Sequence, residues 1–525
     1  MGDSVFALQW WQWILLAGVL LIIAAHTLQL HVDYSGPYRD PRASNDIIIG
    51  NHTQYPFPYH ADEWIHLAYA TFLINEHYIP TFNPYVQYAN HVNIEAGVST
   101  FAALFFLLTG FDPVLSYQYL PTITIVLVGL ALFLFTLFMT RRYAIALMAP
   151  LLLFFIRSNN LSLGFWFFVP ATFGLFFILT AYATYLARGR MRWLTLFIFI
   201  VTLFTYPLAS VMIALGILCM ELYLYLSDPA YRKSIQHRFK HSRTFLIIIG
   251  IGILLLFAVI LVVFHGKLSQ FPLLISYDQQ AGSLASDYNP LTGLGIPLML
   301  LAFVGIYTFI RKKYTLFLLG IVGVLMGELL LFASINATIM IPAARAYFYL
   351  LVFLIPLSAA GIVAIADWAC LRVKQQQTMH HVVAVGTMLL ILAIILALQP
   401  SMQNPTDSLQ TPLQLTEMKD YYALLWIRNN YPQNTMMMVD AVTAPISYPI
   451  AYTQIVALPF SAAGAGDVTA IPRFYNGAST CAERKQVLLS VTPVPKLVYS
   501  MTPLRCDFLR EVYNKERYVY EVQIR

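Results

Sequence analysis

Two adjacent carboxylates and two histidines stand within one short segment that is also rich in aromatic side chains: His60, Asp62, Glu63 and His66. A carboxylate in such a segment can accept a proton from a hydroxyl or an amide, or it can hold a divalent cation. The simpler alternative is that both acids only begin a helix, whose positively polarised end favours carboxylates. A zinc site is a weaker interpretation, because the His-Glu-x-x-His order of many zinc enzymes is absent.

Residues 61–76 have the spacing of a helix, and that helix would position these polar residues. Its apolar stripe consists of Ile65, Ala68, Tyr69, Phe72 and Leu73. We expect such a helix to lie along a membrane surface. Asp62 and His66 are one turn apart and therefore share a face. His60 and His66 are candidates for lining the site.

Four polar residues elsewhere are further candidates. Arg345 opens an apolar run, where a guanidinium can bind a phosphate through two hydrogen bonds or can anchor at the lipid headgroups. Arg157 has the same two interpretations. Asp278 and Asp287 lie in a polar stretch between apolar runs, and each either faces the site or is solvated.

The composition is that of a membrane protein. Of the 525 residues, 11% are charged and 59% are hydrophobic, and the mean hydropathy is +0.67. Because about 25% of the residues of an ordinary soluble domain are charged, we exclude a soluble enzyme, a disordered chain and a nucleic-acid binder. The net charge of +6 is small for this length, and basic cytoplasmic loops explain it better than an anionic partner does.

Apolar runs bounded by charges predict about eleven transmembrane helices, since each crossing needs about 20 apolar residues. They lie near 10–29, 113–139, 143–156, 163–186, 193–205, 208–226, 244–264, 292–310, 315–332, 346–366 and 382–398. Two long apolar stretches, 143–186 and 193–226, are each divided into two spans because of their charges. Each has basic clusters at both ends, so both ends should lie in the cytoplasm and the chain must turn once on the far side of the membrane. One turn is expected near Arg157 and the other near Pro207, a residue that breaks helices.

Basic residues recur in alternate loops, which predicts the orientation. The clusters include Arg141-Arg142, Arg188 to Arg192, Arg232 to Arg243, Arg311 to Lys313, and Arg372 with Lys374. These loops are expected in the cytoplasm together with the amino terminus. The loop 30–112 and the tail 399–525 are then extracytoplasmic, in a multi-pass protein of the cytoplasmic membrane. We interpret 10–29 as an uncleaved anchor, because no basic segment precedes it as in a signal peptide.

The tail 399–525 differs in composition from the membrane region 1–398. Its prolines, ordinary charge density and alternating runs at 436–439 and 487–490 predict a small mixed α/β domain. Cys481 and Cys506 are both expected on the oxidising, extracytoplasmic side of the membrane, where they can form a disulfide or remain as two free thiols.

The order of these features resembles the GT-C superfamily of membrane glycosyltransferases, which use polyprenyl-phosphate or polyprenyl-diphosphate sugar donors. One span is followed by an outer loop with an acidic motif, then by Asn83-Pro84-Tyr85, the apolar segment 99–110 and a span that ends at Arg141-Arg142. The acidic pair looks like that of the protein O-mannosyltransferase and aminoarabinose-transferase branches. The resemblance implies that Asp62 is the catalytic carboxylate and that Glu63 supports it or helps to hold a metal.

The wider layout is similar to the catalytic subunit of oligosaccharyltransferase. His66-Leu-Ala and the Asn83-Pro-Tyr85 stretch resemble its first loop, and Arg345 lies where that family places an arginine for the donor phosphate. Residues 425–432 and Val439-Asp440 resemble the stretch before its peptide-binding Trp-Trp-Asp-Tyr-Gly motif. That motif is absent here, as is the acidic pair of the second outer loop, so sequon-directed protein glycosylation is less well supported.

The predicted function is therefore transfer of a sugar or oligosaccharide from a polyprenyl-linked donor to a glycan, lipid or protein acceptor on the extracytoplasmic face. Mn²⁺ or Mg²⁺ is the expected cofactor if one is used, and the lipid bilayer is the expected environment. A transporter or lipid flippase is an alternative that predicts repeated halves and polar residues on broken helices near the bilayer midplane. A non-catalytic GT-C-like partner subunit is the other alternative.

Overall fold

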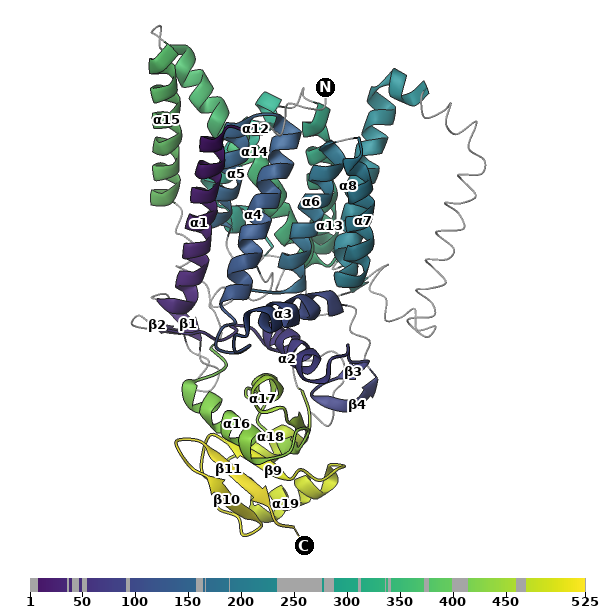
Figure 1. Cartoon of the computed structure of the whole chain (residues 1–525), viewed down its shortest axis with the longest axis vertical. Helices are drawn as coiled ribbons and strands as arrows, with labels where there is room; N and C mark the ends of the chain where they lie inside the picture. The colour runs from purple at the N-terminus through teal and green to yellow at the C-terminus, as the bar shows by residue number, and fades with distance from the viewer. Residues whose placement is uncertain are drawn as a thin grey trace. The chain divides into compact units, whose positions relative to one another are not determined.

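The structure is a computed structural model (Figure 1). It describes residues 8–34, 37–39, 47–49, 54–90, 95–156, 164–165, 167–187, 189–233, 276–277, 288–309, 313–335, 337–338, 341–372, 377–398, 414–458 and 469–524. The chain divides into two compact units. The first contains Met1–Ala24, Thr124–Phe165 and Ala171–Met402, and the second contains Ala25–Ile123, Trp166–Pro170 and Gln403–Arg525.

Seven of the described helices are long and apolar enough to cross a membrane, so the chain is a polytopic integral membrane protein. They are α1 (Trp10–Val32), α4 (Tyr119–Thr140), α6 (Pro170–Ala187), α8 (Pro207–Ser227), α13 (Lys313–Ile335), α14 (Ala343–Arg372) and α15 (Gln377–Leu398). Each coincides with a predicted span.

Three further predicted spans lie on shorter apolar helices. These are α5 (Tyr143–Leu152) with the 3₁₀ turn η1 (Leu153–Phe155), α7 (Met191–Thr205) and α12 (Ile296–Phe309). The turn at Pro207 is confirmed, because Tyr206 has extended backbone between α7 and α8 and the proline occupies the first turn of α8. The predicted span 244–264 lies outside the described residues.

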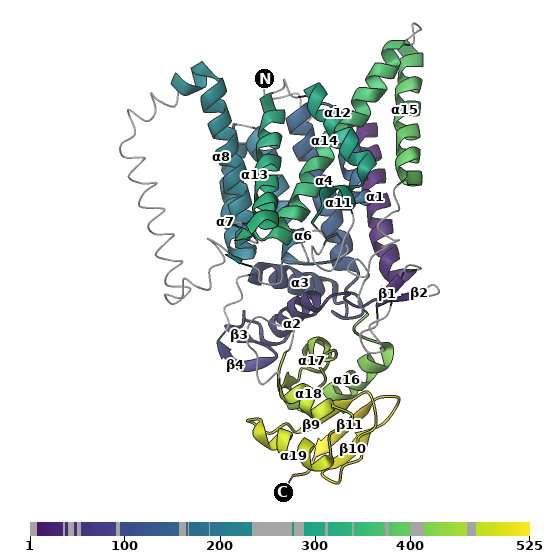
Figure 2. The same cartoon turned by 180° about the vertical axis from the view of Figure 1, so that it is seen from behind.

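Helices α12 and α14 lie side by side in both views (Figure 1, Figure 2) and approach each other closely at two glycines. A Cβ at Gly305 would lie 1.9 Å from the Leu357 carbonyl oxygen, and one at Gly361 would lie 2.0 Å from that of Leu301. The Ser358 hydroxyl donates to the Leu298 carbonyl oxygen at 2.9 Å. Small residues and interhelical hydrogen bonds of this kind are typical of membrane helix packing, where the lipid supplies no hydrophobic drive.

The tail contributes a five-stranded mixed sheet, so the predicted α/β character of this region is confirmed. The strand order is β10-β11-β9-β7-β8, with β7 (Met436–Met438), β8 (Gln454–Ile455), β9 (Leu497–Ser500), β10 (Leu509–Tyr513) and β11 (Tyr518–Val522). β7 runs parallel to both β8 and β9, and the other pairings are antiparallel. Four helices accompany the sheet: α16 (Met418–Asn430), α17 (Ala444–Ala451), α18 (Ala470–Tyr475) and α19 (Cys481–Ser490).

One of the two alternating runs in the tail is a helix. The run 436–439 contains β7 as predicted, but 487–490 ends α19. A capping box formed by Thr480 and Glu483 starts this helix and satisfies its first amide groups. This stabilisation of the helix outweighs the preference for a strand that the short alternating run indicates. Cys481, the first residue of α19, forms a disulfide with Cys506, with 5.5 Å between the Cα atoms.

The second unit contains all of the predicted outer loop 30–112. Its helices α2 (Ala61–Glu76) and α3 (Ala96–Thr109) pack on each other, and the hairpin β3 (Phe82–Asn83) and β4 (Val86–Asn90) connects them. The predicted helix 61–76 is confirmed.

The remaining described elements are short. The strand pair β1 (Pro37–Arg39) and β2 (Ile47–Ile49) belongs to the second unit. The pair β5 (Ser276–Tyr277) and β6 (Ala337–Thr338) and the short helix α11 (Pro290–Leu294) before α12 belong to the first.

We expect Gly361→Ala to lower the free energy of unfolding by about 1–3 kcal/mol or more, because the new methyl group meets backbone that cannot turn aside. Gly327→Ala on α13 is the matched control, since nothing lies within 4 Å of the position that its methyl group would take and alanine favours helix. The measurement is the melting temperature of each variant in detergent. Equal melting temperatures for both variants would contradict the close approach of α12 and α14.

Candidate functional site

The acidic motif lies at the start of α2. His60 precedes the helix with extended backbone, and its Nδ1 accepts a hydrogen bond from the Asp62 amide at 3.1 Å. Glu63 reaches back and accepts from the His60 amide at 3.0 Å, which completes a capping box. Both acids therefore do begin a helix, and the question is which of them retains a carboxylate for chemistry.

The side chain of Glu63 is buried, and its hydrogen bonds hold neighbouring segments of the chain together. Its Oε2 accepts from the amides of Tyr59 and His60, at 2.9 and 3.0 Å. Its Oε1 accepts from the Tyr117 hydroxyl at 2.6 Å and from the Phe168 amide at 2.8 Å. The residue is 1% exposed. A carboxylate has about four lone-pair positions, and here four donors occupy them.

Burial and hydrogen bonding act in opposite directions on this carboxyl group. Burial raises the pKa of Glu63 to about 8 from its ordinary 4.5, while the four hydrogen bonds lower it. Burial and the neighbouring Glu63 also raise the pKa of the Tyr117 phenol, which therefore remains a donor at every working pH.

Asp62 is the accessible member of the pair. Its side chain is 41% exposed, and its Oδ2 lies 3.8 Å from Nδ1 of His60. The rings of His60 and Phe167 meet edge to face at 5.9 Å between centroids, which orients the imidazole beside Asp62. The structure thus separates two adjacent acids into a buried anchor and an exposed carboxylate at the positive end of α2.

His66, one turn further along α2, has an acidic neighbour that sequence reasoning missed. Its Nε2 lies 3.6 Å from Oε2 of Glu95, the residue just before α3. His66 is 7% exposed, and its Nδ1 has no hydrogen-bond partner within the described part of the chain. No spacing rule points to Glu95, because the packing of α2 on α3 brings the two residues together.

Segments of the tail pack against the loop that leads into α2. Tyr55 stacks on Tyr59 at 4.8 Å, and its hydroxyl accepts from the Thr416 amide at 3.2 Å. Phe57 lies 6.0 Å from the ring of Tyr421 on α16. The contacts with Thr416 and Tyr421 join residues more than 350 positions apart in the sequence.

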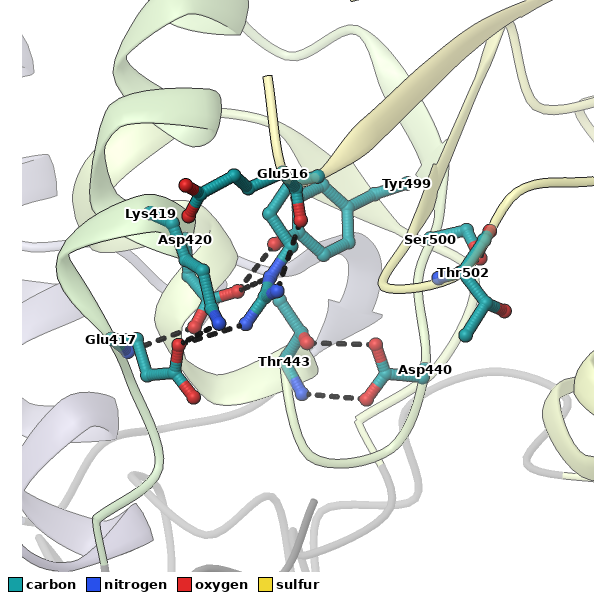
Figure 3. A network of polar contacts seen from close by, with 10 residues as sticks. Glu417, Lys419, Asp420, Asp440, Thr443, Tyr499, Ser500, Thr502 and Glu516 are labelled. Atoms are coloured by element: carbon teal, nitrogen blue, oxygen red, sulfur yellow. Dashed lines mark hydrogen bonds and ion pairs between the residues drawn. The ribbon is translucent and has the colours of Figure 1, made fainter. Parts of the chain in front are cut away.

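Within the tail, buried charges hold α16 to the sheet (Figure 3). Asp420 accepts from the Tyr499 hydroxyl at 2.6 Å and pairs with Arg517, and both charged residues are buried. Arg517 also lies 3.3 Å from Glu417. Buried ions are tolerated when they are paired and hydrogen-bonded as these are.

Asp440, which the sequence places where the oligosaccharyltransferase motif would begin, serves a local turn. Its two oxygens accept from the amides of Val442 and Thr443, at 2.9 and 3.0 Å, and from the Thr443 hydroxyl at 2.7 Å. This arrangement leads into α17, and burial raises the pKa of Asp440. Figure 3 shows its carboxylate directed at Thr443.

The remaining predicted residues are distributed as follows. Arg345 is half-buried in the first turn of α14, in the other unit, and its amide donates to the Pro342 carbonyl oxygen at 2.9 Å. Arg157, Asp278 and Asp287 lie outside the described residues. Across the residues that the structure describes, no three His, Cys, Asp or Glu side chains are grouped as a metal site would require.

Solved membrane glycosyltransferases share this fold. AglB, the oligosaccharyltransferase of Archaeoglobus fulgidus, in complex with an inhibitory peptide and a dolichol-phosphate, has a TM-score of 0.59 and 13% identity, over 94% of this chain and 70% of that one. An Archaeoglobus fulgidus oligosaccharyltransferase in complex with zinc and sulfate has a TM-score of 0.53 and 14% identity, over 92% of this chain and 67% of that one. ArnT from Cupriavidus metallidurans bound to undecaprenyl phosphate has a TM-score of 0.51 and 11% identity, over 97% of both chains.

These similarities confirm the predicted resemblance to the GT-C superfamily at the level of the fold. No protein-family model matches the chain, and no curated sequence matches it. At such low identity a shared fold does not establish a shared activity. The activity has to be argued from the residues of the site.

We expect Glu63→Gln, compared with wild type above pH 8 where the Glu63 carboxyl group is ionised, to lower the free energy of unfolding by at least about 2 kcal/mol, because the new amide NH₂ must face two donors in either orientation. Glu76→Gln, at the exposed end of the same helix, should have no effect. Thermal unfolding in detergent measures both. A melting temperature for Glu63→Gln equal to that of wild type would contradict the four-donor arrangement.

Wild type and Glu63→Gln also test whether burial or hydrogen bonding dominates the pKa of Glu63. An acid whose pKa is raised in the folded chain binds its proton more tightly there, so its contribution to stability is complete below pH 4.5 and falls as the pH rises to about 8. The melting temperature of wild type minus that of Glu63→Gln should therefore shrink between these pH values. A difference that grows with pH would mean that the four hydrogen bonds outweigh burial.

Proposed function

We propose that this protein is a GT-C glycosyltransferase that moves a sugar from a polyprenyl-phosphate or polyprenyl-diphosphate donor to an acceptor on the extracytoplasmic face. The observation that carries the proposal is the division of the acidic pair: Asp62 presents an accessible carboxylate while Glu63 holds its helix in place. It occurs within a fold shared with an enzyme that binds dolichol-phosphate and another that binds undecaprenyl phosphate.

Asp62 is assigned as the catalytic carboxylate. It accepts the proton of an acceptor hydroxyl or amide as the acceptor oxygen or nitrogen attacks the anomeric carbon of the sugar. The bond between that carbon and the phosphate oxygen breaks, and the polyprenyl phosphate or diphosphate leaves with the electron pair. A single displacement of this kind inverts the configuration at the anomeric carbon.

Arg345 is assigned to the donor phosphate, with Arg157 as a second candidate. A guanidinium binds phosphate oxygens through paired hydrogen bonds and stabilises the negative charge that develops on the leaving group. Arg345 occupies the first turn of α14, where helix amides also attract anions.

The described residues only partly fit a divalent cation. Asp62 can offer an oxygen, but the oxygens of Glu63 already accept four hydrogen bonds, so we assign Glu63 a positioning role instead of a metal-ligating one. Zinc is present in one solved structure of an Archaeoglobus fulgidus oligosaccharyltransferase. A requirement for Mn²⁺ or Mg²⁺ remains a proposal that needs ligands beyond Asp62, and no step above depends on it.

The orientation is also proposed. The disulfide between Cys481 and Cys506 supports an oxidising environment for the tail, and the loop with α2 belongs to the same compact unit. Both features agree with the side that the basic loops predict for the tail.

We expect Asp62→Asn to consume the donor at least about 100-fold more slowly than wild type, because the amide cannot accept the proton. Purified protein is incubated with a polyprenyl-linked sugar extract, with and without Mn²⁺ or Mg²⁺, and the lipid products are followed by mass spectrometry. Glu76→Gln, on the same helix, should keep wild-type turnover. Full turnover by a folded Asp62→Asn would overturn the assignment.

We expect Arg345→Gln to weaken binding of undecaprenyl phosphate by at least about tenfold, since one charge-assisted contact is lost. The dissociation constant in detergent is the measurement. Arg192→Gln is the control, because Arg192 lies over the ring of Tyr185 at 4.6 Å in a cluster predicted to be cytoplasmic. Unchanged affinity in a folded Arg345→Gln would place the phosphate elsewhere.

A further inference from the structure

Tyr85 occupies a junction between the hairpin after α2, the first turn of α2 and the tail. It lies in the tight turn between β3 and β4, where Asn83 pairs with Val86 and the Asn83 side chain accepts from the Tyr85 amide at 3.0 Å. Pro84 suits such a turn because its backbone angle is fixed in advance. The turn thereby sends a large aromatic side chain into the interior, where it is fully buried.

Every polar group of Tyr85 has a partner. Its hydroxyl lies 3.2 Å from the carbonyl oxygen of Trp64, two residues after Asp62, and donates to the carbonyl oxygen of Pro445 on α17. Its own carbonyl oxygen accepts from the Ile455 amide of β8 at 3.0 Å. One residue of the loop therefore contacts the first part of α2 and two elements of the tail.

The hydroxyl of Tyr85 acts only as a neutral donor. Burial, together with the nearby Tyr69 and Tyr448, raises the pKa of the phenol well above its ordinary value. The hydroxyl has a single proton, so its loss leaves the Pro445 carbonyl oxygen without this donor in a dry environment, which is costly. The junction is consequently specific to tyrosine, since phenylalanine fills the same space without the donor.

We propose that Tyr85 is a positioning residue through which the tail fixes the first turn of α2, and with it the direction of the Asp62 carboxylate. The tail then takes part in catalysis without contacting the reacting atoms. Tyr55 provides a second contact between the tail and the loop before α2, because its hydroxyl accepts a hydrogen bond from the amide of Thr416, just before α16. The catalytic consequence rests on the proposed function, but the coupling between the tail and α2 does not.

The test compares Tyr85→Phe with Tyr448→Phe. Tyr448 lies on α17 with its ring 5.9 Å from that of Tyr85, and its hydroxyl makes no hydrogen bond to any described residue. Two quantities are measured: amide hydrogen exchange of residues 61–67, and kcat and KM for donor consumption. Tyr85→Phe should speed exchange in this segment and lower kcat roughly five- to tenfold at unchanged KM. Tyr448→Phe should change neither.

The two readouts separate the two ideas. Unchanged exchange in Tyr85→Phe, or faster exchange with wild-type kcat, would overturn the positioning role. If the wild type consumes no donor, the proposed function fails, while faster exchange in Tyr85→Phe would still support the coupling. If Tyr85→Phe does not fold, Tyr55→Phe is measured in the same way, and it should show the same two changes. Neither change in a folded Tyr55→Phe would overturn the proposal.

Discussion

The carboxylate of Glu63 is the contact on which the arrangement around α2 depends. It receives donors from the residues just before its own helix, from Tyr117 before α4 and from Phe168 before α6. Three separate parts of the chain therefore meet at one buried acid. A buried carboxylate is unfavourable unless donors surround it, so the fold must bring all of these donors together at once. That requirement fixes where α2 begins and leaves the neighbouring Asp62 accessible.

This division explains how two adjacent acids can have different roles. Consecutive residues in the first turn of a helix point about 100° apart, so one can be buried while the next is exposed. Glu63 has the reach to close the capping box, and Asp62 keeps its oxygens at the positively polarised end of the helix. The same geometry that makes Glu63 unsuitable as a metal ligand makes it suitable as a support for its neighbour.

The compact unit that holds α2 also holds the tail, although the two are far apart in sequence. Aromatic residues make the connection, through the rings of Phe57 and Tyr421 and the hydroxyls of Tyr55 and Tyr85. Tyrosine suits this purpose because its ring fills space while its hydroxyl satisfies a backbone group. The buried pair of Asp420 and Arg517 in turn holds α16 to the sheet. The tail thus supplies several buried contacts to the loop that leads into α2.

The sequence by itself determined the membrane character, the helix 61–76 and the break at Pro207, because these follow from local composition and periodicity. The resemblance to GT-C enzymes came from the order of the spans and motifs along the chain. It also placed Asp62, Glu63, His60 and His66 in one segment, but it could not divide their roles. Only the tertiary structure decided that Glu63 is buried, that Glu95 approaches His66 and that Tyr85 meets Pro445. Burial and long-range hydrogen bonds depend on which distant segments pack together, and periodicity carries no information about that packing.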